Sequence, residues 1–248
     1  MRRIKLITIF MILLIVLSAC STINVDNKVN SEYTDNSAKQ GSDMDRLLET
    51  ITAETAEYKG VCGVDLTWYY KDNVLVIKGT GEMADYLPPS WDITAPWQDI
   101  SEDIAMVIIQ DGVTYIGENA FNGMRALIRV DIANSVVKIG EKAFHKCYNL
   151  KQININEGLK IISYYSFGDC DKLSILTIPS TVEEIGYGAF EGAGIQELRF
   201  KGDAPKFLDH NGNVKDSNDI NFGKGTMIYY SSDSFDKYID DRYTWVKE

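Results

Sequence analysis

The sequence predicts a mainly β protein with short helical turns, built as a solenoid of stacked coils. A phenylalanine returns at a constant interval, an isoleucine precedes each one at a fixed distance, and an alternating apolar pair precedes each isoleucine. The phenylalanines are Phe121, Phe144, Phe167 and Phe190. A fixed period of this kind is typical of repeat architectures, because one repeat cannot bury its apolar edge alone whereas stacked neighbours share a core.

Residues 1–19 are predicted to be a signal peptide. A basic start precedes an apolar run over residues 6–17, which is shorter than the ~20 helical residues that span a bilayer core. The tetrapeptide Leu17-Ser18-Ala19-Cys20 resembles the lipobox of bacterial lipoproteins. The resemblance implies cleavage before Cys20 and a lipid anchor on Cys20. We therefore expect an exported protein held on the outer face of the bacterial cell membrane, at the cell surface.

Residues 20–57 are expected to form a flexible acidic tether. The segment is rich in Ser, Thr, Asn, Asp and Glu and poor in large apolar residues, a composition that does not build a core. Leu47, Leu48 and Ile51 have the spacing of a short helix next to the folded part. The net charge of −11 argues against a nucleic-acid partner, whose phosphates are bound largely through Lys and Arg.

Residues 58–103 are predicted to be an N-terminal cap built on a β-hairpin. Apolar and polar residues alternate from Leu66 to Tyr70, and Asp72-Asn73 then turns the chain into the apolar run from Val74 to Ile77. A solenoid needs such a cap because its end coil exposes an apolar face. Three tryptophans in this segment favour packing in the cap, with a sugar-stacking platform as the alternative. They are Trp68, Trp91 and Trp97.

Residues 104–200 are predicted to hold four to five coils. Each coil begins with an apolar pair at the strand period of two, so the pair points inward and its neighbours point outward. The pairs are Val107/Ile109, Val130/Ile132, Ile153/Ile155, Leu176/Ile178 and Leu198/Phe200. A glycine follows the isoleucine in most repeats, where it allows a tight turn, but Ser163 replaces it once.

The repeat unit, clearest from Leu127 to Cys147, resembles the BspA-like (treponemal) leucine-rich repeats. The resemblance extends to the cap motifs around Cys62-Gly63 and Ala95-Pro96-Trp97, and to a closing segment. It implies a right-handed leucine-rich-repeat solenoid with a C-terminal cap over residues 201–248. It also implies a bacterial surface or secreted protein, because members of the family are mostly of this kind and some are implicated in adhesion to host proteins or to other cells.

The sequence carries no motif for catalysis, a metal or a cofactor. It contains no G-x-S-x-G, no Walker A and no H-E-x-x-H, and its two histidines cannot build a histidine-rich metal site. The loop from Asp209 to Asn213 departs from a calcium loop, because its glycine comes early and no glutamate closes it. Cys147 and Cys170 fall on adjacent coils, which favours buried thiols and leaves a disulfide as the alternative.

The outward residues of the repeat strands are the predicted ligand face. We expect a protein or glycan partner to bind there, and a set of merely solvated strand residues is the alternative. The candidates are Arg129, Asp131, Gln152, Asn154, Thr177 and Arg199. The sequence thus predicts a non-enzymatic, monomeric recognition lipoprotein of the adhesion type. The alternative is an envelope-associated structural or inhibitory protein that acts on the cell's own wall or surface proteins.

Overall fold

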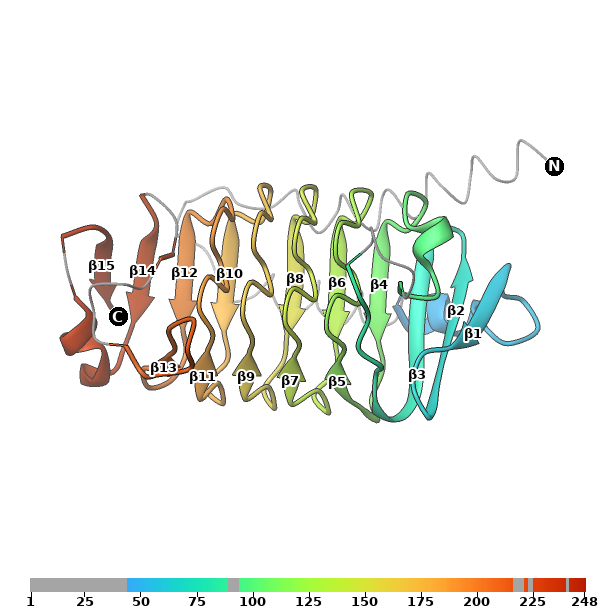
Figure 1. Cartoon of the computed structure of the whole chain (residues 1–248), viewed down its shortest axis with the longest axis horizontal. Helices are drawn as coiled ribbons and strands as arrows, with labels where there is room; N and C mark the ends of the chain where they lie inside the picture. The colour runs from blue at the N-terminus through green and yellow to red at the C-terminus, as the bar shows by residue number, and fades with distance from the viewer. Residues whose placement is uncertain (1–43, 89–93, 216–220, 223–224, 240) are drawn as a thin grey trace, which may run out of the picture.

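The computed structural model describes residues 44–88, 94–215, 221–222, 225–239 and 241–248. The molecule is elongated, with two rows of short strands running along its length and its C-terminal end opposite the N-terminal hairpin (Figure 1). Cys20 and Trp91, and with them the predicted signal peptide and most of the predicted tether, lie outside the described residues. No helix within the described ranges is long and apolar enough to cross a membrane.

Five coils make up the centre, and each contributes one strand to each row. The strands and short helices are β1 (Tyr58–Val61), β2 (Asp65–Lys71), β3 (Val74–Glu82), η1 (Gln98–Ile100), β4 (Met106–Ile109), β5 (Val113–Ile116), β6 (Arg129–Ile132), β7 (Lys138–Ile139), β8 (Gln152–Ile155), β9 (Ile161–Ile162), β10 (Ile175–Ile178), β11 (Glu184–Ile185), β12 (Glu197–Phe200), β13 (Lys206–Phe207), β14 (Met227–Tyr230), η3 (Asp233–Tyr238) and β15 (Thr244–Lys247). Parallel pairing places Val107 opposite Val130 and Val130 opposite Ile153, so equivalent repeat positions lie side by side in successive coils. The predicted mainly β solenoid is confirmed.

The N-terminal hairpin starts both rows of strands. Asp72 and Asn73 both have positive φ, 49° and 68°, as a two-residue turn between β2 and β3 requires. The first half of the long strand β3 pairs with β4, and its second half pairs with β5. The hairpin strand β3 therefore pairs with both strands of the first coil and fixes their positions.

The predicted tether ends earlier than residue 57, which corrects its boundary. Residues 44–50 are helical, as the spacing of Leu47 and Leu48 indicates, and Ile51 behind them is only 3% exposed. This segment packs on the outer face of β3 and β4, against Val76, Met106 and the apolar side chains beside them. The reason is physical: the first strands are apolar on both faces, so the outer face must also be covered. The outer face of the first coil is consequently closed to a partner.

One aromatic stack runs through the core from coil to coil. The Phe121 and Phe144 rings lie 5.2 Å apart and nearly parallel, and the same arrangement continues at 5.6 Å and then 6.1 Å to Phe167 and Phe190. Trp97 from the N-terminal cap stacks on Phe121 at 5.2 Å and closes the row. Trp97 is 1% exposed and its indole nitrogen donates to the Ala120 carbonyl, so this tryptophan packs in the cap.

The first row of strands is interrupted, whereas the second is continuous. The row β3-β4-β6-β8 ends at β8, and β10 begins a separate sheet of order β10-β12-β14-β15. On the other side, β5, β7, β9, β11 and β13 pair without a break. The inward Ile153 is 9% exposed beside the interruption, whereas Val130 in the preceding coil is fully buried. The second row therefore offers the more regular platform for a binding surface.

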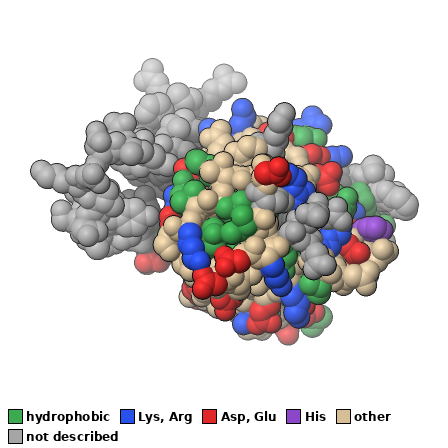
Figure 2. Space-filling view, turned by 90° about the vertical axis from the view of Figure 1, so that its left-hand side faces the viewer, with side chains coloured by type: hydrophobic (Ala, Val, Ile, Leu, Met, Phe, Trp, Pro, Cys, Tyr) green, Lys and Arg blue, Asp and Glu red, His purple; other side chains and the backbone are tan. Residues whose placement is uncertain are grey.

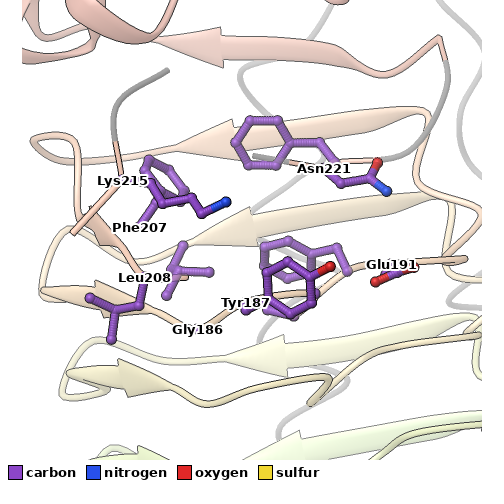
Figure 3. Close-up of a pocket in the computed structure, with 12 residues that line it drawn as sticks. Gly186, Tyr187, Glu191, Phe207, Leu208, Lys215 and Asn221 are labelled. Carbon is purple, nitrogen blue, oxygen red and sulfur yellow. The ribbon is translucent and has the colours of Figure 1, made fainter. Parts of the chain in front are cut away.

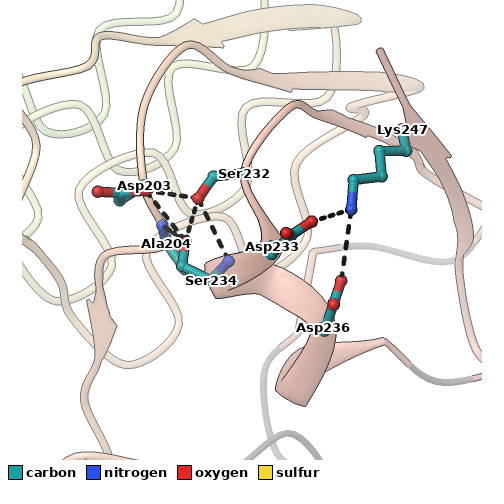
Figure 4. A network of polar contacts seen from close by, with 7 residues as sticks. All are labelled: Asp203, Ala204, Ser232, Asp233, Ser234, Asp236 and Lys247. Carbon is teal, nitrogen blue, oxygen red and sulfur yellow. Dashed lines mark hydrogen bonds and ion pairs between the residues drawn. The ribbon is translucent and has the colours of Figure 1, made fainter.

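The C-terminal cap closes the stack with aromatic side chains and a polar clasp. Phe235 of η3 lies 4.8 Å from the Phe200 ring at the end of the last coil. Ser232 and Ser234 bond Asp203, while Lys247 of β15 forms ion pairs with residues of η3 (Figure 4). Viewed from this end, a small hydrophobic group is surrounded by charged side chains (Figure 2). The apolar end of the solenoid is thus largely covered.

Candidate functional site

The three described cysteines are buried thiols. Cys62, Cys147 and Cys170 are all free, as the sequence interpretation favours. The thiols of Cys147 and Cys170 donate to the carbonyls of Phe121 and Phe144 in the preceding coil. Burial raises the pKa of Cys62 and of Cys147 to about 12, so both remain protonated at neutral pH and are poor nucleophiles.

Four of the six predicted ligand-face residues form one hydrogen-bonded network on β6 and β8. The Arg129 guanidinium donates three hydrogen bonds to the Asp131 carboxylate, at 3.1 to 3.2 Å. Asn154 donates to the same carboxylate, and Gln152 donates to Asn154. The structure therefore brings the four residues together, but their polar groups form hydrogen bonds with one another. The Arg129 side chain is only 9% exposed, which leaves Gln152 and Asn154 as the members more accessible to a partner.

The other two predicted residues lie beyond the interruption of the first row. Thr177 is half-buried on β10. Arg199 on β12 forms ion pairs with Glu197 and Glu248, and its guanidinium lies 3.9 Å from the centroid of the Tyr229 ring. The predicted face is thus divided between two sheets. Arg129 pairs within its own strand, whereas Arg199 links β12 to Tyr229 of β14 and to Glu248.

A groove lies along the second row of strands, where the sequence predicts no site. Its volume is about 310 Å³, which falls at the lower end of the range for small-ligand pockets. Isoleucine side chains of β9 and a glycine of the next coil contribute to its lining. The polar and aromatic lining residues are Tyr115, Tyr164, Glu118, Glu141, Glu184 and Lys138.

A second hollow continues the groove towards the C-terminal cap. It encloses about 90 Å³ and shares Gly186 and Leu208 with the groove. Tyr187, Glu191 and Lys215 line it (Figure 3). The two hollows adjoin at Gly186 and Leu208, and their lining residues come from the coils between β5 and β13. We call the two hollows together the depression.

Glycines in successive coils seat the aromatic rings beside this depression. A Cβ atom on Gly186 would lie 2.5 Å from the Tyr164 ring, and one on Gly188 would lie 2.5 Å from the Tyr165 ring. Tyr165 then contacts Tyr187 edge to face at 5.6 Å, and Tyr187 contacts His210 at 6.0 Å. Each ring lies on a glycine or a ring of the next coil, so the wall of the depression is built to hold its shape.

Carboxylates crowd the N-terminal end of the groove. Asp85 accepts hydrogen bonds from the Tyr115 hydroxyl at 2.7 Å and from the backbone N–H of Glu118 at 2.8 Å. The pKa of Glu118 is raised, first by burial and then by the nearby charges of Glu141 and Asp85. Glu141 and Glu184 each have a lysine partner, at 2.5 and 3.4 Å. The lining residues themselves comprise three glutamates and one lysine, so the lining carries more negative than positive charge.

His145 is half-buried, at a repeat position where the other coils have Asn122, Gly168 and Glu191. Its ring bonds the Gly168 carbonyl and lies edge-on to Tyr165. Burial lowers its pKa more than Asp169 raises it. No group of three or more metal-ligating side chains exists in the part of the chain that the structure describes.

The groove was missed because its residues occupy repeat positions that vary. Tyr164 stands where earlier coils have Glu118 and Glu141, so the repeat frame marks the position as outward and polar. One signal was present in the sequence: tyrosines cluster in residues 164–187 at the same or neighbouring repeat positions, next to glycines of the following repeat.

The arrangement of one strand in each parallel row and one buried phenylalanine per repeat defines a leucine-rich-repeat solenoid. The sequence profile described as BspA type leucine rich repeat region matches residues 100–210 in six copies. The chain is therefore built around a BspA-type leucine-rich repeat region, which confirms the resemblance.

A solved structure agrees with this assignment. The chain is similar to a leucine-rich repeat protein from Eubacterium ventriosum, with 26% identity over 71% of this chain and 45% of that one, at a TM-score of 0.60. The chain thus spans less than half the length of that protein.

Two further likenesses to solved structures are weaker. The leucine-rich repeat protein of T. pallidum has 25% identity over 60% of this chain and 70% of that one, at a TM-score of 0.41. A leucine rich cell surface protein from Faecalibacterium prausnitzii matches at 19% identity, over 71% of this chain and 55% of that one, with a TM-score of 0.38. No curated protein matches the sequence.

Proposed function

We propose that this protein is a non-enzymatic recognition lipoprotein of the bacterial cell surface, anchored through Cys20, which binds a partner on its solenoid. The observation that carries the proposal is the capped stack of coils with the depression along its uninterrupted row of strands. Extended surfaces of stacked repeats commonly serve binding. The buried, protonated thiols and the self-paired network on the strand face fit a scaffold better than a catalytic centre.

The surface location rests on two supports. The first is the lipobox at Leu17-Ser18-Ala19-Cys20. The second is the BspA-type repeat region, since proteins with such repeats are mostly bacterial surface or secreted proteins. An anchor on Cys20 would keep the solenoid close to its own membrane.

One observation favours a second candidate, an envelope protein that acts on the cell's own wall or surface proteins. The described residues start with a helical segment at residue 44, which packs on the solenoid, so few residues separate it from Cys20. Even a fully extended chain between these two positions reaches at most ~80 Å. A partner in the cell's own envelope lies within that reach more readily than a host surface beyond a wall.

Affinity capture tests both candidates. The purified full-length protein, immobilised through a C-terminal tag, is exposed separately to cell-wall extract and to host extracellular matrix. We expect one partner that binds saturably and is eluted by free protein. A partner found only in the wall extract supports the second candidate. The absence of a saturable partner from either source, with the protein folded, would refute the recognition function.

A separate variant tests whether the partner binds the predicted ligand face on β6 and β8. Arg129→Ala is unsuitable, because it would leave the half-buried Asp131 carboxylate without its cation. Gln152→Ala instead removes an accessible amide and leaves the Arg129–Asp131 pair intact. If the partner uses this face, Gln152→Ala weakens its capture; if it uses the groove, capture is unchanged.

A further inference from the structure

Tyr164 is the one described tyrosine without a partner. Each of the other twelve makes a ring contact, a cation–π contact or a hydrogen bond to another side chain or backbone group. Among the described residues, Tyr164 is half-buried, lines the groove and has neither a ring neighbour, nor a cation, nor a hydrogen-bond partner for its hydroxyl. Tyrosine hydroxyls and rings at such sites ordinarily find partners.

The neighbouring tyrosines indicate which partner the ring would accept. Three tyrosines along the depression each have a lysine ammonium over the ring: Lys138 over Tyr115 at 5.3 Å, Lys142 over Tyr165 at 5.9 Å, and Lys215 over Tyr187 at 5.8 Å. Tyr164, which lines the groove between them in the sequence, has no lysine over its ring among the described residues. A cation at such a distance from a ring centroid is attracted by the quadrupole of the ring.

The charges around Tyr164 favour the same kind of ligand. Glu141 holds the equivalent position one coil earlier, and Glu184 lies on the next coil, opposite Ile161 in the strand register. Both carboxylates line the same groove as the Tyr164 ring. The groove contains three glutamates and one lysine, and the whole chain carries −11. An added positive charge would relieve the crowding of these carboxylates.

We propose that the groove binds a lysine or arginine side chain of a partner protein, with its cation placed over the Tyr164 ring between Glu141 and Glu184. This inference rests on the proposed recognition function and assigns it a surface and a partner chemistry. The partner would present a basic segment along the depression. The aromatic wall holds the site open, and the carboxylates attract and orient the cation.

A labelled arginine–glycine hexapeptide is the probe, with the same peptide containing citrulline as its neutral control. Its affinity for the full-length protein is measured by fluorescence anisotropy at low and high salt. We expect the arginine peptide to bind, the citrulline peptide to bind at least fivefold more weakly, and high salt to weaken binding because it screens exposed charges. Equal binding of the two peptides, or no binding of either, would overturn the inference.

Variants then locate the site. Tyr164→Leu should raise the Kd about five- to tenfold, since a partly desolvated cation–π contact contributes ~1–1.4 kcal/mol, while Tyr164→Phe should stay within about twofold of the wild type. Glu184→Gln should weaken binding severalfold. Its matched control is Glu183→Gln, which makes the same charge change on the adjacent residue, outside the groove. An unchanged Kd for Tyr164→Leu, or equal losses for Glu183→Gln and Glu184→Gln, would contradict the assigned site.

Hydrogen–deuterium exchange of the wild-type protein tests the site without any substitution. Bound peptide should slow exchange in residues 161–164 and 184–188, and protection elsewhere alone would overturn the inference. The inference would also be overturned if the Tyr164→Leu protein bound a captured partner as tightly as the wild type does. It would be overturned as well if the captured partner were a neutral oligosaccharide. Those two results would leave the recognition function standing, whereas the lack of any saturable partner refutes that function itself.

Discussion

Replacing Phe144 by leucine isolates what the aromatic stack contributes to stability. Phe144 is fully buried and stacks on Phe121 at 5.2 Å and on Phe167 at 5.6 Å, so the change removes two ring pairs while it keeps an apolar side chain. Each pair contributes about 0.5–1.5 kcal/mol beyond its buried area. We therefore expect Phe144→Leu to lower the free energy of unfolding by about 1–3 kcal/mol.

Urea unfolding followed by circular dichroism measures this loss. Phe144→Ala should cost more, about 3–5 kcal/mol, because it also leaves a cavity between neighbouring coils. Val137→Ala serves as the control, since Val137 is 44% exposed and should cost less than about 0.5 kcal/mol. A Phe144→Leu protein as stable as Val137→Ala would show that the stacked rings contribute no more than ordinary apolar packing.

Four further predictions concern the wall of the groove, the first helix, the histidine and the anchor. Gly188→Ala should destabilise the protein more than Gly225→Ala, by about 1 kcal/mol or more in urea unfolding, because both glycines have positive φ but only Gly188 would place its Cβ against a ring. Ile51→Ala should cost about 2–4 kcal/mol, and equal stability would show that the segment before the hairpin does not belong to the core. NMR titration should give His145 a pKa below 6.5; its folded-state pKa is lowered, so stability should fall as pH decreases from about 7 towards 5, and His145→Gln should flatten that slope. Cys20→Ser should move the protein from the membrane fraction to the soluble fraction, and unchanged fractionation would contradict a lipid anchor on Cys20.

The periodic part of the structure could be predicted from the sequence, because every repeat must bury the same apolar positions. Phe121 and its equivalents lie in one buried stack, and the turn at Asp72-Asn73 lies where the strand pattern changes direction. The inward and outward alternation of Val130 and its neighbours was likewise readable, since it depends only on the strand period.

What could not be predicted depends on contacts between segments outside the repeat pattern. The helix over residues 44–50 looks like tether by composition, and only the doubly apolar β4 strand explains why it folds back. Arg129 and Asp131 lie on the same strand with one residue between them. Their spacing does not reveal that they form an ion pair with each other instead of facing a partner. The groove depends on Tyr164 and Glu184, at positions where the repeat accepts almost any polar residue.

The affinity of a captured partner for three forms of the protein tests the central claim most directly, namely that the solenoid recognises a partner through the groove. Interferometry with immobilised partner compares the wild type, Tyr164→Leu and Gln152→Ala. We predict saturable binding by the wild type, a loss of about five- to tenfold for Tyr164→Leu, and no change for Gln152→Ala. Loss of binding in Gln152→Ala with full binding by Tyr164→Leu would place recognition on the strand face and contradict the account.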